Sequence, residues 1–251
     1  MKINYPLTHL IYDSQGLSLE GIIMKPAGNG PFPTIVLIHG FNNVGGWDYI
    51  FIAVDLVKAG YAVFLPSQIG FGNSKGERDY CGPKTVQGVF DGVQELLKES
   101  FVDRSRLGVW GFSRGSNVST MLSCTFPDLF KAAVFQSGIY DFKKVLETVA
   151  DPRVADNMRN ETGNTEEAFE ERSPIKHVQK AMCPMLILHG EKDTTCRIEQ
   201  VLNFEKKLIE LGKTYEIHIV PDGGHMPLLG TRKQFVIPFF DKYLSHSNKA
   251  S

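Results

Sequence analysis

Residues 107–122 decide the fold of this chain and read Leu-Gly-Val-Trp-Gly-Phe-Ser-Arg-Gly-Ser-Asn-Val-Ser-Thr-Met-Leu. The apolar run at 107–110 is typical of a buried strand. Val118, Met121 and Leu122 recur at helical spacing after it. The stretch therefore predicts a strand that turns directly into a helix.

The turn between strand and helix carries a serine flanked by two glycines, Gly111 and Gly115. Such a turn brings the backbone too close to itself for side chains at the glycine positions. It pushes Ser113 outward on a strained backbone, beside the free N–H groups of a helix N-terminus. This geometry suits a nucleophile.

A second Gly-x-Ser-x-Gly match lies at residues 72–76, with Ser74 at its centre. No apolar strand precedes this match, and Glu77-Arg78-Asp79 follows it instead of an amphipathic helix. We interpret Ser74 as a loop residue.

Composition indicates a soluble globular protein. The chain has 251 residues, 42% hydrophobic and 22% charged, with a net charge of −1. We expect one α/β domain over residues 1–251, although length alone also allows two smaller domains. The balanced charge argues against nucleic acid and against an anionic membrane surface as partners. The sequence does not decide whether the protein forms a homo-oligomer.

The N-terminal sequence does not indicate secretion, and the cysteine pattern does not indicate metal binding. The first residues lack the apolar region of a signal peptide, and no apolar stretch reaches the ~18 residues of a membrane span. We therefore expect a cytoplasmic protein. Cys81, Cys124, Cys183 and Cys196 have no metal-ligand spacing and are predicted to be reduced, with Cys124 packed in the core.

Apolar strand runs alternate with helical patterns along the chain. A hairpin is predicted over residues 8–24, and residues 66–83 are predicted to form a long surface loop. The alternation predicts a mainly parallel sheet of about eight strands with helices on both faces. Further strands are expected at 34–38, 61–65, 107–110, 132–135, 185–188 and 215–220, and helices at 47–59, 86–97, 198–211 and 235–244.

The segment 139–180 interrupts this alternation with a polar, acidic sequence. It could be an exposed excursion of short helices. Alternatively, it forms a small cap over the strand ends that shapes the substrate pocket.

Four loops that follow predicted strands carry reactive groups. They hold His39-Gly40-Phe41, Ser113, Asp193 and His225. Because ligands of parallel α/β sheets collect beyond the carboxyl ends of the strands, we expect these groups to face one crevice.

A serine hydroxyl needs a base at pH 7, and histidine has a pKa near that value. His225 follows Gly223-Gly224, which lets the backbone bend the imidazole toward Ser113. A carboxylate would then orient the imidazole, and we assign Asp193 to that role. Two backbone N–H groups, of Phe41 and Arg114, are expected to form the oxyanion hole. The alternative for Phe41 is a packing aromatic, and both roles are compatible because the oxyanion hole needs only its backbone.

Other residues compete for these roles. Asp141 is an alternative acid, whereas Asp222 is interpreted as a turn residue. His39 and His189 also follow strands, but each precedes a glycine and is interpreted as a structural hydrogen-bonding residue. The remaining histidines have no comparable setting: His9, His177, His218 and His246.

With these residues, the chain resembles the catalytic domain of the prolyl oligopeptidase-type (S9-like) branch of the α/β hydrolases. The resemblance spans residues 34–245, and the order Ser113, Asp193, His225 is that of the α/β-hydrolase fold. The motifs that carry it are Ile38-His39-Gly40, Gly111-Phe112-Ser113-Arg114-Gly115, Arg172-Ser173-Pro174-Ile175, Leu188-His189-Gly190-Glu191-Lys192-Asp193 with Gln200, and Gly223-Gly224-His225.

The resemblance implies the same three catalytic residues and no cofactor. Peptidases of this branch typically carry a large β-propeller first, whereas about thirty residues precede Thr34 here. In addition, Ser67 and Ile69 stand where related hydrolases often have Asp and Arg, and Cys196-Arg197 replaces a common Val-Pro.

The leading hypothesis is a carboxylesterase-like serine hydrolase of small acyl esters that works through an acyl-enzyme intermediate. The alternative is an S9-like aminopeptidase or acylpeptide hydrolase of short peptides. A third hypothesis is a non-catalytic ligand-binding protein on the same fold.

Overall fold

The computed structural model describes residues 5–149, 151–225 and 230–245. His246 lies outside them. In chain order the strands are β1 (Leu7–Ser14), β2 (Leu17–Met24), β3 (Phe32–Ile38), β4 (Ala62–Pro66), β5 (Val102–Phe112), β6 (Ala132–Gln136), β7 (Met185–Gly190) and β8 (Tyr215–Val220). The helices are α1 (Ile50–Lys58), α2 (Pro83–Leu96), α3 (Arg114–Thr125), α4 (Phe142–Thr148), α5 (Pro152–Thr162), α6 (Glu166–Arg172), α7 (Glu199–Glu210) and α8 (Ile237–Leu244).

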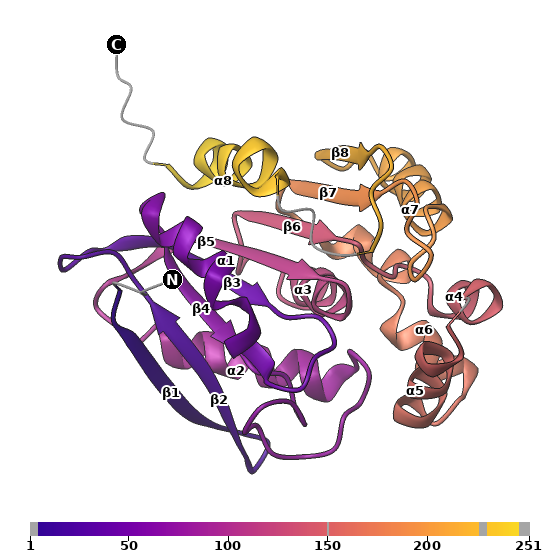
Figure 1. Cartoon of the computed structure of the whole chain (residues 1–251), viewed down its shortest axis with the longest axis horizontal. Helices are drawn as coiled ribbons and strands as arrows, with labels where there is room; N and C mark the ends of the chain where they lie inside the picture. The colour runs from indigo at the N-terminus through magenta and orange to yellow at the C-terminus, as the bar shows by residue number, and fades with distance from the viewer. Residues whose placement is uncertain (1–4, 150, 226–229, 246–251) are drawn as a thin grey trace.

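The eight strands form one sheet in the order β1-β2-β4-β3-β5-β6-β7-β8. β4, β3 and β5 to β8 are parallel, whereas β2 pairs antiparallel with both β1 and β4. The chain passes from β3 outward to β4 and then returns to the other side of β3 as β5 (Figure 1). This reversal between β3 and β5 is where open α/β sheets form ligand sites. The α/β-hydrolase fold and the strand count predicted from sequence are confirmed.

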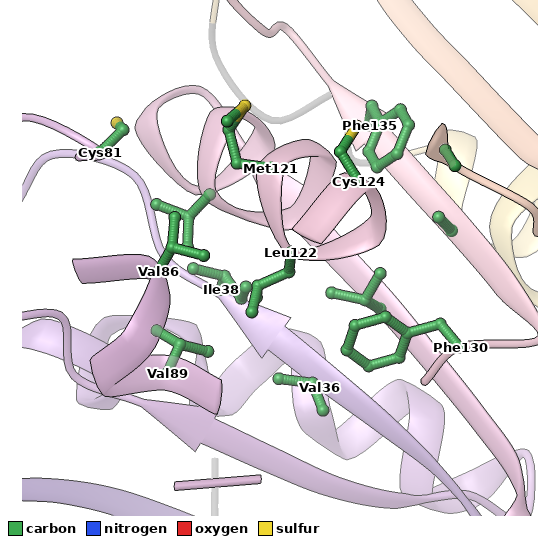
Figure 2. Packing of buried hydrophobic residues seen from close by; sticks show 14 of the residues in the cluster. Val36, Ile38, Cys81, Val86, Val89, Met121, Leu122, Cys124, Phe130 and Phe135 are labelled. Atoms are coloured by element: carbon green, nitrogen blue, oxygen red, sulfur yellow. The ribbon is translucent and has the colours of Figure 1, made fainter. Parts of the chain in front are cut away.

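Helices cover both faces of the sheet. α1 and α8 pack on one face, in a core that includes Ile35, Leu37 and Trp110. On the other face, α2, α3 and α7 pack on Val36, Ile38 and the neighbouring strands. Figure 2 shows Leu122 of α3 and Ile38 of β3 pointing toward Val86 and Val89 of α2. Cys124 lies in the same core, as predicted.

Helix boundaries differ from the prediction by a few residues. α2 begins at Pro83, because a proline at the first helical position lacks only an N–H that has no partner there. α1 begins at Ile50, since Gly45–Tyr49 forms a 3-10 turn instead of the predicted first helical turn. A π-helical turn, Arg232–Val236, leads into α8.

The loop between β4 and α2 is not the surface loop that the sequence suggested. Its glycines and prolines indicated exposure, but much of it packs inside the molecule, where its polar groups are paired. Buried Glu20 accepts from the backbone N–H of Asn73 at 2.8 Å, and Ser74 Oγ donates to the Ser67 carbonyl at 2.9 Å. The buried side chains of this loop are Ser67, Gln68, Ile69, Phe71, Ser74, Asp79, Tyr80 and Cys81.

The segment 139–180 contains α4, α5 and α6, which begin at side-chain caps. Asp141 accepts from the Lys144 N–H, Asp151 from the Arg153 N–H, and Thr165 from the Ala168 N–H. The three helices lie together beyond the ends of β6 and β7 (Figure 1). Arg172, buried at the end of α6, donates from Nε to the Asp79 carbonyl at 3.0 Å and so joins this segment to the β4–α2 loop.

The turn from β5 into α3 packs directly on β3. A Cβ at Gly115 would lie 2.2 Å from the Ile38 carbonyl oxygen, and one at Gly111 would lie 2.0 Å from the Gly115 carbonyl oxygen. These are backbone atoms, which cannot rotate away as a side chain can. Glycine is therefore required at both positions.

We predict that Gly115→Ala destabilises the protein by about 3 kcal/mol, because backbone segments of β3 and α3 must separate. Gly212→Ala is the matched control, since Gly212 has φ +61° but nothing within 4 Å of its added Cβ. That control should lose only about 1 kcal/mol to left-handed backbone strain. Urea unfolding of both variants measures the difference, and equal losses would contradict the packing argument.

Candidate active site

Ser113 sits in the turn at the carboxyl end of β5, with φ +52° and ψ −120°. This left-handed conformation is strained for a non-glycine residue. The Ser113 N–H donates to the Gln136 carbonyl at 2.8 Å, which holds the turn against β6. This backbone conformation places the Ser113 hydroxyl at the start of α3, pointing away from the sheet.

The structure brings Ser113 together with the predicted histidine and aspartate. His225 Nε2 lies 2.8 Å from Ser113 Oγ, and His225 Nδ1 lies 2.8 Å from Asp193 Oδ2. A carboxylate at Nδ1 favours the proton on that nitrogen and leaves Nε2 free to accept the serine proton. The chain of contacts therefore has the geometry of a serine nucleophile with its base.

Asp193 is buried and held by backbone donors. Its Oδ1 accepts from the N–H groups of Thr195 at 2.9 Å and Cys196 at 2.8 Å. Oδ2 is thereby directed toward His225. Asp141, the alternative acid, instead caps α4, and Asp222 adopts φ +58° in the turn after β8.

The other strand-end histidines have structural contacts. His189 Nε2 lies 2.6 Å from the Cys196 carbonyl oxygen, so it bonds the same turn that holds Asp193. His39 Nδ1 lies 2.7 Å from the Gly40 carbonyl oxygen, and the Gln68 N–H donates to His39 Nε2 at 3.0 Å. Burial lowers the pKa of His189, and it lowers that of His39 to about 4. Both rings therefore stay neutral at pH 7.

The two expected oxyanion donors come from adjacent segments. Phe41 follows the end of β3, and Arg114 is the first residue of α3. Among the turns and loops of the described residues, the N–H groups of Phe41 and Arg114 donate to no backbone carbonyl. The hydroxyl of Tyr49 accepts from the Gly40 N–H at 3.1 Å and helps to fix the turn before Phe41.

The Arg114 side chain is a feature that the sequence reasoning missed. Although it carries a charge, it is only 3% exposed. Its NH2 donates to Glu161 Oε2 of α5 at 2.7 Å, and its Nε donates to Gln68 Oε1 at 3.3 Å. The guanidinium also lies over the rings of Phe71 and Tyr80. No spacing in the sequence links these partners, which come from distant segments.

A cavity of about 580 Å³ opens beside Ser113 and His225. Apolar groups dominate its wall, and Asp151, Arg153 and Asn157 of the α5 region also line it. The apolar part of the wall is formed by Phe41, Tyr80, Phe112, Ile139, Val154 and Cys196.

Cys196 is a second potential nucleophile in this wall. Burial and the neighbouring Asp193 carboxylate raise the pKa of its thiol well above the ordinary value. The thiol therefore stays protonated and does not compete with Ser113. All four cysteines are free and buried.

The described residues hold no group of three or more His, Cys, Asp or Glu side chains arranged for a metal ion. Within the same ranges, no helix has both the length and the hydropathy needed to cross a bilayer.

The sequence matches a known protein family and several known proteins. The model of the prolyl oligopeptidase family matches residues 50–247. The chain is 26% identical to the uncharacterized peptidase YtmA of Bacillus subtilis, over 82% of this chain and 81% of that protein. It is also 26% identical to the acylamino-acid-releasing enzyme of Mus musculus, over 83% of this chain but only 31% of the mouse enzyme.

Solved structures share the fold. The puromycin-hydrolyzing peptidase of Mycobacterium tuberculosis superposes with a TM-score of 0.85 at 22% identity, covering 96% of this chain and 40% of that one. Acetyl xylan esterase 1 from Thermoanaerobacterium superposes with a TM-score of 0.76 at 20% identity, covering 98% and 86% of the two chains. The chain thus spans less than half of the first peptidase and most of the esterase.

We predict that His39 makes stability pH-dependent. The folded state keeps His39 neutral until the pH approaches 4, whereas the unfolded chain protonates it below about 6.5. The unfolded state therefore binds more protons between these values, so stability falls as the pH drops through this window. His39→Gln should lose about 2 kcal/mol less than the wild type between pH 7 and pH 5. Urea unfolding at both pH values tests this, and equal losses would contradict it.

Proposed function

Because the chain belongs to the prolyl oligopeptidase family, we propose that Ser113, His225 and Asp193 act in it as the nucleophile, general base and orienting acid of a serine hydrolase. The observation that carries the proposal is the continuous set of contacts from Ser113 Oγ through the imidazole to Asp193, at 2.8 Å each. The strained turn and the free N–H groups beside it support the same roles.

The reaction follows from this geometry. Ser113 Oγ attacks the substrate carbonyl carbon while His225 Nε2 takes its proton, and the N–H groups of Phe41 and Arg114 bind the developing oxyanion. The imidazolium then protonates the leaving group, which departs and leaves an acyl-enzyme. Water attacks this ester with His225 as base, releasing the acid and restoring Ser113.

Peptides are the better-supported substrates. The sequence analysis favoured an esterase of small acyl esters over a peptidase. The family match and the relatives, one named a peptidase and one an acylamino-acid-releasing enzyme, instead favour the peptidase alternative. Ester hydrolysis is the second candidate, since the structurally similar acetyl xylan esterase shares the fold and the cavity wall is mainly apolar.

The charges around the cavity favour a substrate with a blocked amino terminus. Asp151 is the only carboxylate among the described lining residues. It is already bound by Arg153, with contacts of 2.7 Å from NH2 to Oδ2 and 3.1 Å from Nε to Oδ1. No unpaired carboxylate of the described lining thus remains for a free α-ammonium group. We propose that α4 to α6 act as a cap that supplies this wall, and that N-acylated peptides are preferred.

A fluorophosphonate probe tests the nucleophile. The wild type should be labelled, because Ser113 Oγ attacks phosphorus and displaces fluoride. Ser113→Ala should lose the label completely. Ser74→Ala is the matched control and should keep the label. Ser74 lies in the same Gly-x-Ser-x-Gly pattern but not in a turn from a strand into a helix. A wild-type protein that circular dichroism shows to be folded, but that stays unlabelled, would favour the non-catalytic binding hypothesis.

Two anilides test the substrate class. Acetyl-alanyl p-nitroanilide should have a kcat/KM at least about tenfold above that of alanyl p-nitroanilide at pH 7, because the cavity leaves the ammonium unpaired. The gap should narrow at pH 9, where an α-amino group of pKa about 8 is mostly neutral.

Arg153→Ala is the matched variant, since it frees Asp151 and should raise turnover of the free-amino substrate alone. A preference for the free amine in the wild type would reverse the assignment. Hydrolysis of short aryl esters with neither anilide cleaved would favour the esterase.

A further inference from the structure

Gln68 joins the two segments that carry the expected oxyanion donors. Its side chain is 1% exposed and lies in the loop between β4 and α2. Gln68 Nε2 donates to the His39 carbonyl oxygen at 2.6 Å, and Gln68 Oε1 accepts from Arg114 Nε at 3.3 Å. One amide therefore contacts both the end of β3 and the start of α3.

Gln68 also sets the state of the His39 ring. Its backbone N–H donates to His39 Nε2 at 3.0 Å, so that nitrogen must be the acceptor and Nδ1 must carry the proton. Nδ1–H then donates to the Gly40 carbonyl oxygen at 2.7 Å. The ring is thus fixed from both sides in its neutral form.

The Gly40 carbonyl belongs to the same peptide unit as the Phe41 N–H. Because a trans peptide is planar, the direction of one group determines the opposite direction of the other. The bond from His39 to Gly40 therefore aims the Phe41 N–H, and Gln68 holds His39 in the position that makes this bond. The contact with Arg114 Nε fixes the residue that supplies the second N–H.

We infer that Gln68 is a positioning residue of the oxyanion hole, acting through His39 on the Phe41 N–H and through Arg114 on the other donor. It does not touch the reacting atoms itself. The inference rests on the proposed hydrolase function and adds to it a residue with no catalytic chemistry of its own. No local motif indicates this role, because the three contacts join residues 29 and 46 positions apart.

The test compares Gln68→Met, which keeps the side-chain length and the backbone N–H, with Gln68→Glu, which keeps an acceptor for Arg114 but removes the donor to His39. Oxyanion donors act on the transition state, and losing one typically costs ~10² to 10³ in rate. Because substituting Gln68 displaces a donor without deleting it, we expect kcat to fall about tenfold or more in both variants, with KM within about twofold.

A tetrahedral-adduct inhibitor separates positioning from general destabilisation. The inhibition constant of an acetyl-alanyl trifluoromethyl ketone should rise by the same factor as kcat falls, whereas that of the product acetyl-alanine should stay unchanged. The ratio of the two constants does not depend on the fraction of protein that is folded.

Gln200→Met is the matched control. Gln200 is also a buried amide that holds backbone groups, since its Oε1 accepts from the N–H groups of Tyr140 and Asp141 at 2.9 Å each. It should leave the ratio of inhibition constants as in the wild type. Wild-type values of kcat and of this ratio in Gln68→Met, or the same change in Gln200→Met, would overturn the inference. A wild type without turnover or fluorophosphonate labelling would instead overturn the proposed function.

Discussion

The close approach of the turn after β5 to the end of β3 is the constraint on which the site depends. With hydrogen in place of a side chain, Gly115 can lie against the Ile38 carbonyl, and Gly111 can lie against Gly115. This contact brings the start of α3 beside the residues that follow β3, so that a strained serine and two backbone N–H groups share one sheet edge. A methyl group at Gly115 would push α3 away from β3, and one at Gly111 would push α3 away from β5. The packing of two backbones thus determines the chemistry available at the crevice.

Sequence patterns predicted the regular part of this arrangement well. The strands were recognisable as short apolar runs, and residues after their carboxyl ends had to converge because parallel strands end at the same edge. That argument predicted that Ser113, Asp193 and His225 face one crevice. It did not extend to the loop between β4 and α2, where glycine and proline suggested exposure. Much of the loop is buried because partners from distant segments, such as Glu20, satisfy its polar groups, and pairing of that kind leaves no periodic signal in the sequence.

Three histidines lie at or beyond the carboxyl ends of strands, and their surroundings give them different properties. His39 is fully buried between hydrogen-bonding partners, near the cations Arg114 and Arg78, which lower its pKa further. His189 is also buried and bonds the turn that holds Asp193. His225 is the histidine of the three whose ring reaches both the serine hydroxyl and the carboxylate. The same residue type therefore stabilises two turns and supplies the candidate base at a third.

Arg114 connects the cavity wall to the expected oxyanion hole. Its backbone begins α3, while its guanidinium binds Glu161 of α5, and the same Glu161 oxygen accepts from the Tyr80 N–H at 3.0 Å. A buried charge is tolerated only where such partners compensate it, because the desolvation of an unpaired guanidinium costs several kcal/mol. If α5 moved away from the sheet, Arg114 would lose its counter-charge while keeping its contact with Gln68. The ion pair therefore favours the arrangement in which α5 lines the cavity, and it makes the geometry of the start of α3 dependent on a helix that lies outside the sheet and its covering layers.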